Sequence, residues 1–150
     1  MAEEVEEMVL IQQGEKESLE LGGLRFVACR REVGEFGGWT LEVWGPVAGE
    51  DTQVLRFDCF RGAPHYHMPP SAKGQLALDP NEVGDGLAWA LDCARHQLPE
   101  MVAKAGFADL AQELDGSVFE AGTSEIEKLV ARVPEPTESF EVPASVVKEA

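Results

Sequence analysis

The period of the apolar residues changes once along the chain, and this change constrains the fold more than any other feature. In the first half, apolar and polar residues alternate in LRFVACRRE (24–32), WTLEVWG (39–45) and QVLRFDCF (53–60), as in strands with one buried face. Turns rich in glycine or containing proline (34–38 and 46–52) separate these runs. Links this short allow hairpins but no crossovers, so the pattern predicts an antiparallel β-meander.

The second half has the spacing of helices. From Leu87 the apolar residues recur at steps of four, three and four up to Leu98. Further helices are expected in PEMVAKAG (99–106), FADLAQEL (107–114) and residues 125–132. The sequence therefore predicts an α+β fold, in which an N-terminal antiparallel β-meander of three to four strands is followed by three to four helices packed on one face.

A chain of 150 residues is long enough for one domain with its own core. MVLIQQ (8–13) is expected to form a short first strand. The segment PEPTESFEVPASVVKEA (134–150) contains three prolines and four glutamates, which oppose regular structure. We expect a single α+β domain over 1–133 and an acidic, disordered tail over 134–150.

The net charge of −16, from 28 acidic and 12 basic residues, restricts the partners of the chain. Such a surface repels phosphate backbones and argues against nucleic acid as a partner. No apolar run reaches the roughly 20 residues that cross a bilayer, so no membrane partner is expected. A homodimer, formed through the sheet, or another protein partner is compatible with the composition.

The cysteines and the N-terminal sequence indicate the cellular compartment of the protein. Cys29, Cys59 and Cys93 are odd in number, widely spaced and contain no CxxC pair, which predicts reduced thiols rather than disulfides. The acidic start MAEEVEEMVLIQQ lacks the basic region of a secretory signal. We therefore expect a soluble cytoplasmic protein.

The stretch RFDCFRGAPHYHMPP (56–70) contains two of the three histidines of the chain. If residues 65–67 are extended, His65 and His67 point to the same side and Tyr66 to the other. Two imidazoles bind zinc, iron, nickel or copper, and Asp58 on the preceding strand could complete a set of two histidines and one carboxylate. The stretch predicts a site for a divalent transition metal at Asp58, His65 and His67.

Other residues belong to the candidate site less directly. Arg56 and Tyr66 flank the proposed ligands, while Cys59 and His96 could be brought in by folding. A structural alternative is a hydrogen-bonded corner in which the histidines tie the sheet to the next segment. An acid/base site without a metal, with Asp58 orienting a histidine, is a further alternative.

The segments FDCF, PHYH, LPEM and AGFADLA, found between residues 57 and 111, together resemble an uncharacterised prokaryotic family, a domain of unknown function covering roughly residues 20 to 130. The resemblance implies no activity, cofactor or catalytic residue. RFDCFRGAPHYH is also loosely similar to the histidine cluster of small toxins from toxin–antitoxin pairs. The acidic composition departs from what an RNA-cleaving toxin requires.

Two classes of function follow from these observations. The first is a small binding or interaction module whose histidine corner is either a structural feature or a metal site. The alternative is a metal-dependent hydrolase, or a toxin-like ribonuclease, that uses Asp58, His65 and His67 and a metal-bound water. The sequence names neither a reaction nor a substrate.

Overall fold

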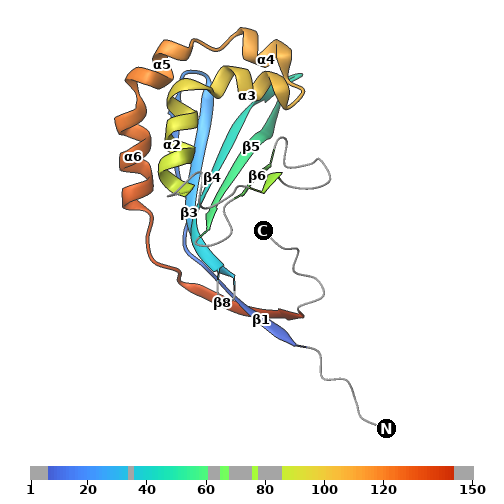
Figure 1. The fold of residues 1–150 in the computed structure, drawn as a ribbon, viewed down its shortest axis with the longest axis vertical. Coiled ribbons are helices and arrows are strands. Elements are labelled where there is room, and N and C mark those ends of the chain that lie inside the picture. The colour runs from blue at the N-terminus through green and yellow to red at the C-terminus, as the bar shows by residue number, and fades with distance from the viewer. Residues whose placement is uncertain (1–6, 34–35, 61–64, 68–75, 78–85, 144–150) are drawn as a thin grey trace.

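The computed structural model describes residues 7–33, 36–60, 65–67, 76–77 and 86–143, with side chains at all of these except 33, 36, 60, 65–67 and 76–77. Within this part the chain forms one antiparallel sheet of eight strands and five helices (Figure 1). The strands are β1 (Met8–Gln13), β2 (Glu17–Leu21), β3 (Leu24–Val33), β4 (Phe36–Val47), β5 (Glu50–Phe60), β6 (His65–His67), β7 (Leu76–Ala77) and β8 (Glu138–Pro143). The helices are α2 (Gly86–His96), α3 (Leu98–Lys104), α4 (Ala108–Gln112), α5 (Gly116–Ala121) and α6 (Thr123–Arg132).

Three long strands, β3, β4 and β5, make the centre of the sheet, and the described strands follow the order β7-β6-β5-β4-β3-β1-β8. β1 and β2 share one edge of β3, since β2 pairs with residues 24–28 and β1 with residues 31–33. Between these two strands the Gly14 N–H donates to the Arg30 carbonyl oxygen over 2.9 Å. The N-terminal segment thus runs along β3 as one interrupted strand.

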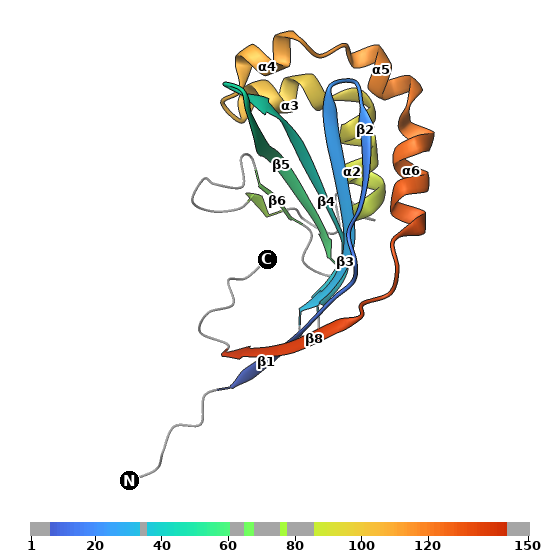
Figure 2. The same ribbon diagram turned by 180° about the vertical axis from the view of Figure 1, so that it is seen from behind.

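The helices cover a single face of the sheet and enclose the core. Figure 2 looks onto the opposite face, with α2 behind β2 and β3. Phe26 and Phe57 from the sheet are at most 1% exposed, as is Phe119 from α5. The Phe26 and Phe119 rings meet edge to face with centroids 6.2 Å apart. Burying a side chain of this size contributes about 1.5–3 kcal/mol, so this interface supplies much of the driving force for folding.

Close packing between α4 and β4 depends on Gly45. A Cβ atom at this position would lie 2.8 Å from both Leu24 Cδ2 and Leu110 Cδ2. Real Cβ atoms do not approach other carbon atoms so closely, so these two leucine side chains can lie where they do only because residue 45 has no side chain.

The predicted α+β class, with strands first and helices second, is confirmed, but the sheet contains more strands than the predicted three to four. The N-terminal segment supplies two strands because it breaks at Gly14. β6 lies at the segment 65–67, which is expected to be extended but is not among the predicted strands, and β7, with two residues, is too short for alternation to be recognised. A fifth helix, α5, begins after Asp115, whose side chain accepts a hydrogen bond from the Ser117 amide.

The prediction of a disordered tail is wrong for residues 138–143, which form β8. This strand pairs with β1 over six residue pairs, from Met8 with Pro143 to Gln13 with Glu138. Pro143 is the last residue of an end strand, a position where its missing amide hydrogen is tolerated. The remainder of the expected tail, 144–150, lies outside the described residues.

Cys29, Cys59 and Cys93 are buried and form no disulfide in the structure. Across the described ranges, every helix is too short or too polar to cross a lipid bilayer.

Candidate functional site

The sheet face opposite the helices carries a set of polar side chains, which we call the polar face. Alternation along the three central strands places them there, because every second residue of a strand points to the same side. On β5 a bulge opposite Val43 and Trp44 lets Val54 and Leu55 both enter the core while Gln53 returns to the polar face. The residues of the polar face are Arg25, Cys29 and Arg31 of β3, Thr40, Glu42 and Trp44 of β4, and Gln53, Arg56 and Asp58 of β5, with the apolar Val27 of β3 among them.

Glu42 accepts three hydrogen bonds on the polar face. Its Oε2 receives Lys16 Nζ over 3.0 Å, and its Oε1 receives Trp44 Nε1 over 2.8 Å and Gln53 Nε2 over 3.4 Å. Glu42 is 6% exposed, whereas the Lys16 side chain is 49% exposed. A carboxylate so buried needs partners, and these three donors compensate for its lost hydration.

Asp58 is the second buried carboxylate of the polar face, with 2% exposure. The Thr40 hydroxyl donates to its Oδ1 over 3.0 Å, and Arg56 Nε donates to its Oδ2 over 3.2 Å. Thr40 is also 2% exposed, while the Arg56 side chain is 29% exposed. The carboxylate is therefore held in a fixed orientation between a neutral donor on β4 and a cation on its own strand.

The predicted extended segment at 65–67 is strand β6, which pairs with β5. The register sets His65 opposite Asp58, His67 opposite Arg56, and Tyr66 opposite Phe57. The side chains of these three residues lie outside the described part of the structure. Among the described side chains, no group of three histidine, cysteine or acidic residues has the spacing of a metal site, and the predicted ligands His65 and His67 are not among those side chains.

Two other predicted site residues lie on the helix side of the sheet. Cys59 follows Asp58 and belongs to the hydrophobic core, with 8% exposure. His96 ends α2, where its Nε2 lies 3.7 Å from Asp92 Oδ1, and its side chain is 48% exposed. Because α2 covers the helix side, the structure does not bring Cys59 or His96 to the face of Asp58.

Several polar-face residues were not among the predicted site residues. Cys29 lies in register with Thr40, which in turn lies in register with Asp58, so the three form one row across the sheet. Burial raises the pKa of the Cys29 thiol, an effect that the nearby Lys16 ammonium opposes. Strand alternation alone places Thr40 and Glu42 on one side of β4, but their partners on β5 depend on the register.

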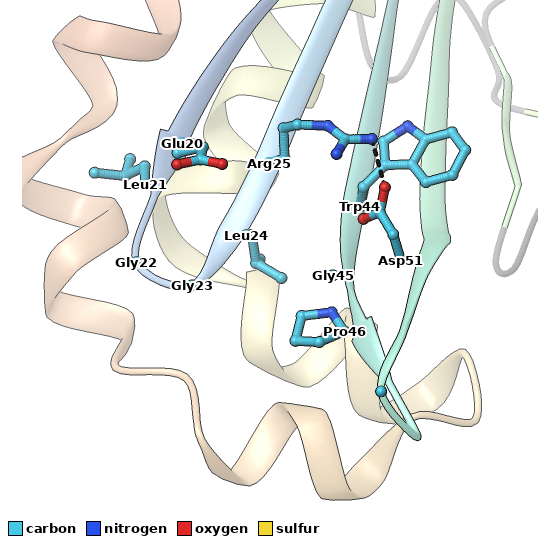
Figure 3. A pocket seen from close by; sticks show the side chains of 11 residues that line it. Glu20, Leu21, Gly22, Gly23, Leu24, Arg25, Trp44, Gly45, Pro46 and Asp51 are labelled. Carbon is cyan, nitrogen blue, oxygen red and sulfur yellow. Dashed lines mark ion pairs between the residues drawn. The ribbon is translucent and has the colours of Figure 1, made fainter.

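A hollow of about 540 Å³ lies at the tips of the β2–β3 and β4–β5 hairpins (Figure 3). Arg25 Nη2 pairs there with Asp51 Oδ2 over 2.8 Å, and its guanidinium lies 5.2 Å from the centre of the Trp44 ring. Gly22 and Gly23 form the tip of the first hairpin with positive φ angles of 61° and 86°. Of the charged residues that line the hollow, Arg25 and Asp51 pair with each other, so these two define no class of ligand.

Comparison of the sequence with protein families gives a match to a domain of unknown function, DUF7700, over residues 18–130. Comparison with curated proteins and with solved structures gives no match. The matched range spans β2 to most of α6 and includes the whole polar face, whereas β1 and β8 lie outside it. The chain therefore belongs to the DUF7700 family, a domain whose function is unknown.

Proposed function

We propose that the chain is a binding module that takes a divalent transition metal at Asp58, His65 and His67, where β5 meets β6. The observation that supports this proposal is the register of the two strands, which sets His65 directly opposite the buried carboxylate of Asp58. Directly opposite residues in antiparallel strands share a face, with Cβ atoms about 4.5–5.5 Å apart. His67, two residues on, shares the same face of the strand.

The surroundings of Asp58 are consistent with a role as ligand. Carboxylates that bind metals are themselves held by hydrogen bonds, which fix their orientation. Thr40 and Arg56 supply such bonds to the two oxygens of Asp58. Two imidazole nitrogens and one carboxylate oxygen form a set that zinc and non-haem iron accept, with room for a further ligand.

Metal analysis of the untagged protein, purified without chelator and then dialysed against Zn²⁺, tests the proposal. We expect about one equivalent of zinc in the wild type and none in the His65→Ala/His67→Ala variant. His96→Ala is the matched control because His96 lies on the helix side, so this variant should keep its zinc. Equal zinc contents in the wild type and the double variant would contradict the site.

Thermal unfolding separates a metal site from the structural corner. A ligand that binds only the folded state raises its stability, so chelator should lower the Tm of the wild type and leave the double variant unchanged. If the histidines only tie the sheet to the next segment, the double variant should unfold at a lower temperature with or without chelator. The metal-dependent hydrolase uses the same ligands and stays a prediction.

A further inference from the structure

Each buried carboxylate of the polar face already has a cation beside it. Lys16 Nζ lies 3.0 Å from Glu42 Oε2, and Arg56 Nε lies 3.2 Å from Asp58 Oδ2. A lysine or arginine carries one positive charge and a carboxylate carries one negative charge. The two pairs together therefore have no net charge.

A divalent metal at Asp58, His65 and His67 would change this balance, because histidines bind metals in their neutral form. The metal would add two positive charges beside a carboxylate that is 2% exposed, where little water is available to hydrate them. A carboxylate without a cation partner would offset one of these charges, but Asp58 is already paired with Arg56. Charge that is buried without compensation is costly, so the loaded site needs a negatively charged ligand.

Arg56 adjoins two of the proposed metal ligands. It precedes Asp58 by two residues on β5, so both side chains point to the polar face. On the neighbouring strand, the residue directly opposite Arg56 is His67. The Arg56 side chain is 29% exposed, whereas that of Asp58 is 2% exposed, so a ligand that arrives from solvent can reach the guanidinium. Arg56 is thus placed to contact a molecule that is bound to the metal.

We propose that the metal binds a small oxyanion, a carboxylate or phosphate group, and that Arg56 contacts this anion. The inference rests on the proposed metal site and extends it by naming the class of ligand. A guanidinium has five N–H donors in a plane that matches the oxygens of carboxylates and phosphates, and its Nε donates to Asp58. The anion lies between the metal and the guanidinium, where its negative charge offsets both.

Arg56 should oppose binding of the metal and favour binding of the anion. Like charges repel, so the guanidinium beside Asp58 weakens metal binding when no anion is present. Once the metal is bound, the guanidinium contributes charge-assisted hydrogen bonds to the anion. A residue that only held Asp58 in place would instead strengthen the binding of both. The two affinities therefore distinguish contact with an anion from a structural role.

Visible spectroscopy of the full chain loaded with Co²⁺ tests these opposite effects. Co²⁺ accepts the ligands that zinc accepts, and its absorption changes when a further ligand binds. Titrations with acetate and with methyl phosphate measure the affinity for each anion and show which group the site prefers. We expect Arg56→Gln to bind Co²⁺ about tenfold more tightly without anion, and to bind the anions at least about tenfold more weakly.

Arg25→Gln is the matched control. It removes the same charge from the polar face, but Arg25 pairs with Asp51 at the hairpin tips (Figure 3). Arg25 lies four residues along β3 from Cys29, which is in the row of Asp58, so both affinities should stay close to those of the wild type. Arg56→Lys keeps the charge and should retain part of the affinity for the anions. Circular dichroism should show that all variants fold.

The outcomes separate this inference from the proposed function. A wild type that takes up neither Co²⁺ nor Zn²⁺ would refute the metal site and, with it, this inference. If Co²⁺ binds but neither anion changes its spectrum, the metal site stands and the inference is wrong. The inference is also wrong if Arg56→Gln binds the anions as tightly as the wild type, or if it loses affinity for the metal as well as for the anions.

Discussion

The hydrogen bond between Thr40 and Asp58 allows a sharp prediction, because the free energy of unfolding that its removal costs can be estimated from the structure. Both residues are 2% exposed, and the Thr40 hydroxyl donates to Asp58 Oδ1 over 3.0 Å. Thr40→Val keeps the shape of the side chain and removes the donor. A hydrogen bond to a charged group contributes about 1.5–3 kcal/mol. Because Arg56 Nε still donates to Asp58 Oδ2, we expect a loss in the lower half of that range, about 2 kcal/mol.

Thr52→Val is the matched control for this prediction. The Thr52 hydroxyl, on β5, also donates a hydrogen bond, over 3.1 Å, but its acceptor is the backbone oxygen of Glu50 and the bond is exposed. Its removal leaves no buried carboxylate short of a donor, so we expect a change within about 0.5 kcal/mol. Urea unfolding followed by tryptophan fluorescence measures both variants. For a chain of this length, 2 kcal/mol corresponds to a Tm lower by about 4–8 °C.

A double-mutant cycle with Asp58→Asn assigns the loss to the pair. We expect a coupling energy of about 1 kcal/mol or more between positions 40 and 58, because the two side chains are in direct contact. If Thr40→Val costs no more than Thr52→Val, the bond contributes nothing to stability. The reasoning that the polar face is a hydrogen-bonded buried network would then be refuted.

Three further predictions concern packing at Gly45 and the thiol of Cys93. Gly45→Ala should lower the free energy of unfolding in urea by about 1–3 kcal/mol, because the new methyl group would lie 2.8 Å from Leu24 and Leu110. Gly116→Ala is the control: the nearest atom to its new methyl group lies at 3.9 Å, so the loss of stability should be much smaller. Burial, with a smaller effect from the Asp92 carboxylate, raises the pKa of Cys93 to about 11, so its thiol should react with a disulfide reagent at pH 8 only after unfolding. The same shift should lower the free energy of unfolding as pH rises from about 9 toward 11, because the unfolded thiol loses its proton first. Fast reaction of Cys93 in the folded protein, or wild-type stability in Gly45→Ala, would contradict these predictions.

The central strands could be predicted from the sequence because their alternation is long and their turns contain glycine. β3, β4 and β5 were recognised as three runs, although each strand begins or ends a few residues away from the run. β8 could not be recognised, since its residues alternate too briefly and stand among prolines. β8 forms because it pairs with β1 from the other end of the chain. Pairing with a distant strand produces no pattern in the local sequence.

The candidate site shows the same division between local and long-range information. Alternation and spacing predict that Asp58 and the two histidines share one face, because that relation lies within one short stretch of chain, and the register sets His65 opposite Asp58. Lys16 and Thr40 were missed because their contacts with Glu42 and Asp58 join residues 26 and 18 positions apart. Such pairs follow from the strand register, which the turns and the bulge in β5 determine.

The polar face contains buried carboxylates, which stability of the fold does not require. Thr40, Glu42 and Asp58 are all less than 9% exposed, at the centre of a sheet face that no described helix covers. Apolar residues of similar volume at buried ion pairs are often as stabilising or more so, because charged groups lose hydration on burial. Fold stability alone therefore does not explain the two buried carboxylates. Binding of a cation would explain Asp58, because this carboxylate is held by Thr40 and Arg56, lies on a residue opposite His65 and could bind a metal without rearrangement. On this physical ground we favour the metal-binding module over the purely structural corner.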